Sequence, residues 1–317
     1  MMRTAVIGAG YLGRFHAQKY ASLENSTLVG IVDPDAGARE AVSSELGVAA
    51  YPDHRALIGR IDAVSIVTPT PMHHAIARDF LEGGAHVLVE KPMTVTVEQA
   101  RDLIAIAKRR GRILQVGHLE RFNAAMRALQ PILTVPRFIE SARLAPFKAR
   151  GTDVDVVLDL MIHDIDLILS IVRSPVVSVD AVGTRVFSGE IDIANARLRF
   201  ANGCVANATA SRVSMKTERK LRLFQDDAYV SVDLHQKVRT LIRKDPGRTT
   251  DGTPAVAIDE TSYEASDALR DEIAAFLAAA SSGSSPPVTG EEGLAALEVA
   301  LAITAQVARA QAQSGPG

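Results

Sequence analysis

Residues 4–33, TAVIGAGYLGRFHAQKYASLENSTLVGIVD, constrain the fold more than any other part of the chain. A short apolar run at residues 5–7 leads into the pattern G-x-G-x-x-G, and a helical stretch follows. A second apolar run, residues 28–32, ends at Asp33. This order predicts a strand, a tight turn, a helix and a second strand. The glycine pattern alone could be an ordinary turn, but the strand before it and the helix after it indicate a nucleotide-binding unit.

The glycines of this pattern have different physical roles. Gly8 makes the turn, Gly10 lets the backbone approach a pyrophosphate, and Gly13 lets the helix and the strand pack closely. Tyr11 and Leu12 lie at the start of the helix, whose free N–H groups can bind an anion. We therefore expect these five residues to bind a dinucleotide cofactor.

Asp33 lies twenty positions after Gly13, at the end of the second predicted strand. A carboxylate there can accept hydrogen bonds from both ribose hydroxyls and would repel a 2′-phosphate. The sequence therefore predicts NAD as the cofactor in preference to NADP.

Composition and charge exclude several classes of protein. A chain of 317 residues, 47% apolar and 23% charged, can form two globular domains with separate cores. Its net charge of −2 gives no bulk attraction to nucleic acid or an anionic membrane. The single cysteine, Cys204, and the absence of a signal-peptide pattern before the first strand favour a cytoplasmic protein. Residues 294–310 are apolar but short and partly charged, so we expect a packed helix and no membrane span.

Strand-like and helical segments alternate from residue 35 to residue 116, which predicts a parallel six-stranded sheet. The strand-like runs are residues 48–51, 63–67, 86–89 and 113–116, and the helical stretches are residues 35–46 and 97–110. We assign residues 1–119 to this NAD-binding Rossmann domain.

Two loops follow strands of this sheet and should line the cofactor cleft, because doubly wound sheets bind ligands at the carboxyl ends of their strands. The first loop contains Thr68, Pro69, Thr70 and His73. Its prolines could instead only stiffen a turn. For His73, a cofactor contact and a structural position near a helix start fit the sequence equally well.

The second loop is Glu90-Lys91-Pro92. A lysine here can hold a positive charge beside both the cofactor and a reacting oxygen, and the proline after it fixes the local backbone. The alternative is a solvated lysine at a strand end, which is the usual position of lysine. We interpret Glu90 and Lys91 as cofactor-binding residues.

From residue 137 the pattern changes to successive strand-like runs, which predicts an α+β domain over residues 120–317 with an open, largely antiparallel sheet. The runs are residues 138–144, 176–187, 193–200, 205–211, 221–224 and 229–234. Asn202-Gly203 is a hairpin signal. Residues 244–254 and 281–287 are loops by composition, and residues 266–280 and 291–312 are helical.

A further helix is predicted in this domain, at residues 155–172, DVVLDLMIHDIDLILSIV. Its surface is mostly apolar, which is typical of a helix buried on nearly every side. A polar stripe crosses it at spacings of four, four, three and four, through Asp155, Asp159, His163, Asp166 and Ser170. Buried polar groups are costly unless they are paired or line a wet cleft. The stripe must therefore face something polar.

Asp159 and His163 form the part of this stripe best suited to proton transfer. The carboxylate could orient the imidazole and stabilise its protonated form, as a general acid/base requires. The alternative is a set of internal hydrogen bonds within a buried helix. The sequence offers no further convincing ligand set for a metal, so we expect none.

With the glycine pattern, Asp33, Glu90-Lys91-Pro92 and the pair Asp159/His163, the whole chain resembles the glucose-fructose oxidoreductase, inositol dehydrogenase and MocA family. The resemblance implies an active site between a Rossmann domain and a second domain whose open sheet forms a homodimer or homotetramer. It also implies a cis Lys91–Pro92 bond, contact of Lys91 with nicotinamide and substrate, and His163 as acid/base with Asp159 beside it.

Within that family, GHLERFN at residues 117–123, DLMIHDID at residues 159–166 and ASR at residues 210–212 are similar to the UDP-N-acetylglucosamine 3-dehydrogenases. This similarity implies NAD-dependent oxidation of the 3-hydroxyl of that sugar nucleotide, and a keto-sugar that suits a transaminase. His163 would take the proton and Lys91 would stabilise the oxyanion.

Four basic residues bear on the substrate: Arg121, Arg143, Lys148 and Arg150. They could hold a diphosphate, with Arg121 our candidate substrate-binding residue, or form an ordinary solvated loop. Inositol, a free hexose or another polyol is the alternative substrate, and a non-catalytic NAD-binding sensor is the alternative class.

Overall fold

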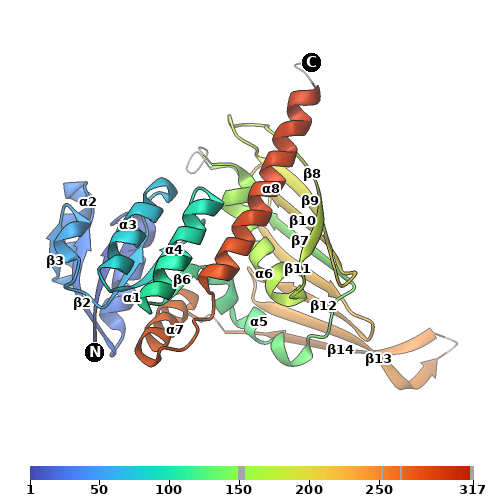
Figure 1. Cartoon of the computed structure of the whole chain (residues 1–317). Helices are drawn as coiled ribbons and strands as arrows, with labels where there is room; N and C mark the ends of the chain where they lie inside the picture. The colour runs from blue at the N-terminus through green and yellow to red at the C-terminus, as the bar shows by residue number, and fades with distance from the viewer. Residues whose placement is uncertain (149–153, 251–252, 265, 315–317) are drawn as a thin grey trace. The chain divides into compact units, whose positions relative to one another are not determined.

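The computed structural model describes residues 1–148, 154–250, 253–264 and 266–314 (Figure 1). The chain divides into two compact units. The first contains Met1–Phe122 together with Asp267–Leu294, and the second contains Asn123–Ser266 and Ala295–Gly317. Compactness thus assigns residues 267–294 to the first unit, whereas the predicted division at residue 119 placed them in the second domain.

The first unit is built on a parallel six-stranded sheet, as predicted, and its strand order is β3-β2-β1-β4-β5-β6. The strands are β1 Met2–Ile7, β2 Ser26–Val32, β3 Ala49–Tyr51, β4 Ala63–Ile66, β5 His86–Glu90 and β6 Leu114–Gly117. All four residues of β4 are buried, because helices cover both faces of such a sheet. The strand order reverses between β1 and β4, where doubly wound sheets bind ligands.

The helices of the first unit begin and end at residues that suit helix termini. They are α1 Tyr11–Ser22, α2 Ala36–Leu46, α3 Thr70–Glu82, α4 Val97–Arg110 and α7 Ala268–Ser282, with a short 3₁₀ turn η1 His54–Leu57 and another, η2, Leu119–Phe122. Asp35 caps α2 and Thr96 caps α4 by accepting hydrogen bonds from backbone N–H groups. Helix α7 packs on α1, and buried Phe276 shares a core with Tyr20.

The second unit contains an eight-stranded sheet in the order β14-β13-β12-β11-β7-β10-β9-β8. Its strands are β7 Phe138–Leu144, β8 Val176–Thr184, β9 Ile193–Phe200, β10 Val205–Ser211, β11 Glu218–Phe224, β12 Ala228–Asp233, β13 Val238–Thr250 and β14 Thr253–Ser262. All neighbouring pairs are antiparallel except β7 and β10, which are parallel. The predicted, largely antiparallel sheet is confirmed.

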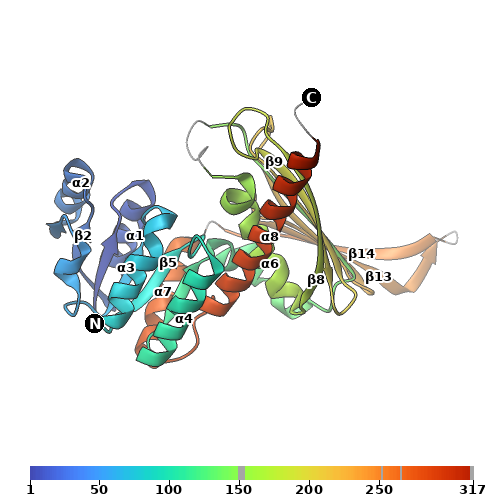
Figure 2. The same cartoon turned by 45° about the horizontal axis from the view of Figure 1, so that its top comes forward.

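The loop predicted for residues 244–254 is wrong, because β13 and β14 form a hairpin there. Figure 2 shows the two strands as a ribbon that continues past their neighbours. The cross-strand register shifts between Lys244 and Thr249, so the Pro-Gly segment lies in an irregular stretch. Pro254 lies on the edge strand β14, where a missing N–H is tolerated.

Helices cover one face of this sheet. They are α6 Ile162–Val172 and α8 Gly290–Ser314, preceded by the short segments α5 Ala124–Arg127, η3 Gln130–Ile132 and η4 Val157–Met161. Several strand residues of the core between them are alanines, such as Ala196 and Ala208, and these let the helices approach that part of the sheet closely. Among the described helices, one, Gly290–Gln313, has the length and the mean hydropathy (1.4) of a membrane span. Its residues Ile303 and Val307 lie in the core of the second unit, as in a packed helix.

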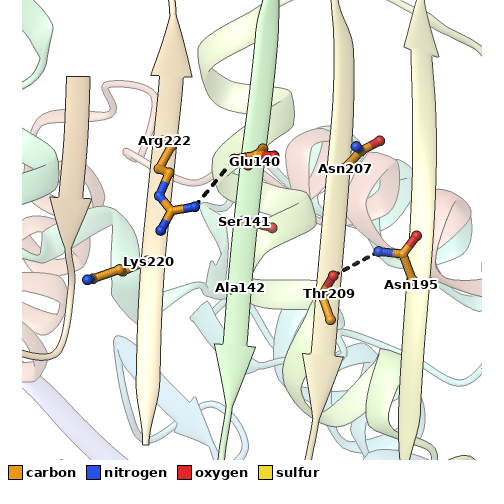
Figure 3. A pocket seen from close by; sticks show the side chains of 8 residues that line it. All are labelled: Glu140, Ser141, Ala142, Asn195, Asn207, Thr209, Lys220 and Arg222. Carbon is orange, nitrogen blue, oxygen red and sulfur yellow. Dashed lines mark hydrogen bonds and ion pairs between the residues drawn. The ribbon is translucent and has the colours of Figure 1, made fainter. Parts of the chain in front are cut away.

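The opposite face of the sheet carries no helix from its own unit among the described residues, and its centre is polar (Figure 3). A shallow cavity of about 250 Å³ lies there across β11, β7, β10 and β9. Arg222 faces Glu140 at 3.4 Å, and the Asn195 amide donates to the Thr209 hydroxyl at 2.8 Å. We call this side the open face.

A buried carboxylate ends β8 earlier than predicted. Asp192 accepts hydrogen bonds from the backbone N–H groups of residues 186–188 at 2.7–2.9 Å, so those amides cannot join a strand ladder. Arg212 donates to the same carboxylate at 3.0 Å. Burial alone would raise the pKa of Asp192, but the hydrogen bonds from the Ser188 hydroxyl and these backbone amides outweigh it and hold the pKa well below that of a free aspartate.

This geometry predicts that Asp192→Asn lowers the free energy of unfolding by about 3 kcal/mol at neutral pH, since it leaves a buried guanidinium without its anion. A depressed pKa contributes stability above the ordinary aspartate pKa, so the difference from wild type should shrink as the pH falls below about 4. Urea unfolding at several pH values measures both effects. Asp180→Asn, at an exposed position, serves as the control. A loss of unfolding free energy in Asp192→Asn that does not depend on pH would contradict the lowered pKa of Asp192.

Candidate active site

The glycine turn between β1 and α1 leaves room on one side only. A Cβ atom on Gly8, whose φ is +101°, would lie 2.5 Å from the Val67 carbonyl oxygen. A Cβ on Gly13 would lie 1.8 Å from the Gly8 carbonyl oxygen, so α1 can approach the turn only with glycine there. At Gly10 a Cβ would meet no atom within 4 Å. Gly10 therefore borders open space, as a residue that must admit a pyrophosphate should.

A cavity of about 790 Å³ lies beside this turn, at the carboxyl ends of β1, β2 and β4. Its wall includes Gly10, Asp33, Thr68 and Pro69. The Thr68 hydroxyl oxygen is buried and has no hydrogen-bond partner among the described residues. A buried hydroxyl normally finds a partner, so this atom fits a wall that binds a polar ligand.

The start of α1 suits an anion. Gly10 is the N-cap residue, and no described side chain caps this helix end. The first N–H groups of the helix can therefore donate to a phosphate. Tyr11 is exposed on the first turn, with its ring at 5.0 Å from that of Phe15, and Leu12 is half-buried.

Asp33 is fixed across the glycine turn. Its Oδ2 accepts a hydrogen bond from the Ala9 N–H at 2.7 Å, and its Oδ1 accepts one from the Asp35 N–H at 2.9 Å. Each oxygen can accept a further hydrogen bond. The carboxylate thus lines the cavity in a fixed orientation, which suits two ribose hydroxyls and disfavours a phosphate.

His73 and Thr70 are not among the described residues that line the cavity. His73 is buried, with Nε2 at 2.7 Å from the Thr68 carbonyl oxygen and Nδ1 at 3.0 Å from the Pro92 carbonyl oxygen. The structure thus favours the structural alternative for His73, since its ring contacts two loops. Thr70 is the first residue of α3.

The loop after β5 brings Glu90 and Lys91 to the same edge of the sheet. Glu90 Oε1 lies 3.2 Å from His16 Nε2, and Glu90 Oε2 accepts the Lys91 N–H at 3.2 Å. Burial alone would raise the pKa of Glu90, but the hydrogen bond from His16 and the charges of His16 and Lys91 lower it below its ordinary value. The bond between Lys91 and Pro92 is cis, as the family resemblance implied.

His16 is a site residue that the sequence reasoning missed. It lies on α1, fully buried, three positions after Gly13. Its position among the buried residues of α1, with Gly13, Ala17 and Tyr20, is the signal that could have identified it. A histidine on a helix face that packs against a sheet needs a polar partner, and that partner is Glu90.

In the second unit the predicted polar stripe is only partly present. Asp155 precedes the helix, and its carboxylate accepts hydrogen bonds from the backbone N–H groups of Val157 and Leu158. It is therefore a helix cap, and the stripe begins at Asp159. The Ser170 hydroxyl donates to the Leu167 carbonyl. The other members, Asp159, His163 and Asp166, lie on or just after a π-helical turn, η4, which the sequence did not predict.

Asp159 and His163 are half-buried, whereas most side chains around them are buried. Asp159 lies in η4 and His163 in the first turn of α6. A single π turn inserts one residue into a helix and is frequent at functional sites. Asp159 thus lies in the irregular turn of a buried helix and His163 just after it, and their assigned roles stay predictions.

The basic residues separate into different environments. Arg143 and Asp164 form a buried ion pair at 2.9 Å with each side chain 4% exposed, so Arg143 balances an internal charge. Arg121 pairs with Glu292 at 3.2 Å within the first unit. Lys148 is exposed, and Arg150 lies outside the described residues.

Comparison with known proteins matches this architecture. Residues 2–118 match the oxidoreductase family with an NAD-binding Rossmann fold, and residues 136–231 match the GFO/IDH/MocA C-terminal domain. The chain is therefore an NAD-binding oxidoreductase, a dehydrogenase acting on CH–OH groups. It belongs to the Gfo/Idh/MocA family.

Relatives within the family cover nearly the whole chain. UDP-N-acetylglucosamine 3-dehydrogenase of Acidithiobacillus ferrooxidans is 42% identical over 97% of this chain and 99% of its own. A solved structure of that protein has a TM-score of 0.92 at 41% identity, over 96% of this chain and 97% of its own. The scyllo-inositol 2-dehydrogenase (NAD(+)) of Bacillus subtilis is 27% identical over 96% of this chain and 93% of its own.

The open space at Gly10 predicts that a substitution there can weaken NAD binding without destabilising the fold. Gly10→Ala should leave thermal unfolding unchanged, because its φ of −65° suits alanine and the added methyl meets no protein atom. The same methyl occupies the space that the pyrophosphate needs, so we expect NAD to bind at least about tenfold more weakly. Calorimetric titration with NAD measures the change. Gly189→Ala, also in open space, is the control, and unchanged NAD affinity in Gly10→Ala would contradict the assignment.

Proposed function

We propose that this dehydrogenase oxidises the 3-hydroxyl of UDP-N-acetylglucosamine to a ketone with NAD. The observation that carries the proposal is the 42% identity, over nearly the full length of both chains, to a UDP-N-acetylglucosamine 3-dehydrogenase. The motifs at residues 117–123 and 159–166 support it.

The proposed mechanism assigns three side chains. NAD, when bound, accepts the hydride from the carbinol carbon. His163 takes the hydroxyl proton as the C–H bond breaks, and Asp159 orients the imidazole and balances its new charge. The Lys91 ammonium stabilises the oxygen while negative charge develops on it. The products are the ketone, NADH and a protonated His163.

The surroundings of Lys91 support its role. Glu90 is nearly buried, its pKa is lowered, and it accepts the Lys91 backbone N–H. The charge of Lys91 is one cause of that lowered pKa, so the carboxylate and the ammonium attract each other. The cationic form is the one that stabilises an oxyanion.

The test of this function is NADH formation with UDP-N-acetylglucosamine, other UDP-sugars, inositols and free hexoses. An amine-transferring enzyme is included to remove keto products, because alcohol oxidation by NAD is often uphill. We expect a signal with UDP-N-acetylglucosamine. A signal only with inositols would support the inositol dehydrogenase alternative, which the relative in Bacillus subtilis favours, and silence across the panel would favour a sensor.

Two substitutions then test the assigned residues. His163→Ala and Lys91→Ala should each lower turnover by about a hundredfold or more, since each removes a group that acts on the transition state. NAD affinity should change little for His163→Ala. Wild-type turnover in either variant would remove that residue from the mechanism. Lys108→Ala, on α4, is the control for loss of a lysine.

We also propose that the protein assembles with copies of itself through the open face, in the cytoplasm, and supplies its keto-sugar to a transaminase. A row of apolar side chains crosses the open face at matching register: Ile258, Ile242, Tyr229, Phe224 and Phe138. Neighbouring rings in this row lie 5.1 and 5.5 Å apart. Ile258 at the end of the row is 64% exposed. The other four residues of the row are half-buried. A continuous apolar row that stays partly exposed is typical of a surface that another subunit covers.

A charge in this row should reduce the assembly. Phe224→Asp places a carboxylate that would be buried at the subunit contact, so we expect the particle mass in sedimentation to fall to that of a smaller species. Met215→Asp replaces an apolar residue that is 99% exposed and lies outside the row, and should not change the mass. A wild-type monomer at micromolar concentration would contradict the proposal.

A further inference from the structure

The Glu90–Pro92 loop is held by two buried histidines. His16 lies on α1 and is fully buried, and His73 lies on α3 with 1% of its surface exposed. Helix α1 connects β1 to β2, and α3 connects β4 to β5. In the sheet order, the first connection moves toward β3 and the second moves toward β6. Because such crossovers are right-handed, the two helices lie on opposite faces of the sheet. The loop is therefore fixed from both sides.

His73 connects two separate loops through one ring. Its Nε2 lies 2.7 Å from the Thr68 carbonyl oxygen, and its Nδ1 lies 3.0 Å from the Pro92 carbonyl oxygen. Thr68 lines the cavity beside the glycine turn, and Pro92 directly follows Lys91. The ring thus bridges the loop that lines the cofactor cavity and the loop that carries the lysine.

The protonation of His73 limits what the bridge can do. Burial lowers the pKa of His73, although the two carbonyl groups and Glu90 act in the opposite direction. A neutral imidazole has one N–H group, so it can donate to one carbonyl at a time. In the neutral ring the two hydrogen bonds therefore belong to alternative tautomers, and only the protonated ring makes both at once. A substitution can remove either one.

His16 acts on the same loop through a side chain. Its Nε2 meets Glu90 Oε1 at 3.2 Å, and Glu90 Oε2 accepts the N–H of Lys91 at 3.2 Å. A chain of contacts thus runs from α1 to the backbone of the lysine. The His16 contact fixes the loop at Glu90, whereas the His73 contact fixes it at Pro92.

We propose that His73 is a positioning residue that couples the cofactor-lining Thr68 loop to the Lys91–Pro92 loop through its two ring nitrogens, while His16 holds the loop from the opposite face. The inference rests on the proposed role of Lys91. A displacement of about 1 Å in a catalytic group can lower turnover about a hundredfold, so loss of the Pro92 contact should affect turnover more than folding.

Two substitutions separate the two contacts. In His73→Asn, the side-chain amide carries its N–H₂ at the position of Nδ1 and can still donate to the Pro92 carbonyl. In His73→Gln, the N–H₂ lies one bond further, near the position of Nε2, and can still donate to the Thr68 carbonyl. Each variant therefore keeps one half of the bridge.

The two variants should affect different quantities, turnover in one and NAD affinity in the other. His73→Gln should lower turnover at saturating NAD by about tenfold or more while NAD affinity stays within about threefold of wild type. His73→Asn should weaken NAD binding by about fivefold or more while turnover at saturating NAD stays within about threefold. Turnover is measured with the sugar from the panel that gives the largest NADH signal, and NAD affinity by calorimetry without any sugar.

His74→Gln is the matched control. His74 is the next residue of α3, and its Nε2 pairs at 2.8 Å with Asp102, which belongs to α4 and to neither loop. This variant should change neither turnover nor NAD affinity beyond about twofold. If His73→Asn and His73→Gln lower turnover and affinity in the same proportion, or behave like the control, the coupling role is refuted.

Amide hydrogen exchange makes the test independent of the substrate. His73→Gln should speed exchange in the peptide of residues 91–96, and His73→Asn in the peptide of residues 67–72, because each lost hydrogen bond releases one loop. If no sugar in the panel reacts but these two patterns appear, the proposed function fails and the bridge stands. If both peptides respond equally in both variants, the bridge fails whatever the substrate.

Discussion

The contact between α1 and the glycine turn determines much of the first unit. Helix α1 begins where it does only because residue 13 has no side chain, since a Cβ there would overlap the Gly8 carbonyl oxygen at 1.8 Å. The close approach directs the first N–H groups of α1 toward the cavity. It also places His16, one turn further along the helix, against Glu90. The cofactor wall and the support of the lysine loop therefore depend on one missing methyl group.

Buried polar groups in both units are paired across long sequence separations, which is how their positions are fixed. Glu90 is 74 residues from His16, and the Arg143–Asp164 pair joins β7 to α6. A buried charge with a well-oriented partner costs less than one without, and removing either partner is strongly destabilising. In the first unit the same kind of pairing holds the loops that border the cavity. Stability and positioning thus rest on the same groups.

The sequence was sufficient for the features that depend on local spacing. The glycine pattern, the distance to Asp33 and the alternating apolar runs specified all six parallel strands and the cofactor edge, because each follows from backbone geometry within about thirty residues. The cis bond at Lys91–Pro92 came only from the family resemblance. The cofactor followed from Asp33 itself.

Other features depend on partners that local patterns do not specify. The hairpin of β13 and β14 was missed because its Gly, Pro and Thr content is typical of a loop, and its register becomes irregular after Lys244. The π turn at Asp159 leaves the apolar pattern of the helix almost unchanged. Nothing near Arg143 in the sequence indicates that its charge is balanced by Asp164. The structural position of His73 required knowledge of the Pro92 carbonyl, nineteen residues away.

The central claim is that hydride passes from the carbinol carbon of a sugar nucleotide to NAD held beside the glycine turn. The most direct measurement uses UDP-N-acetylglucosamine with deuterium at C3, and follows the isotope by mass spectrometry of the nicotinamide. The account predicts that the NADH formed carries the deuterium, and that the keto-sugar has lost it. NADH without deuterium, or a product that retains the isotope at C3, would contradict it.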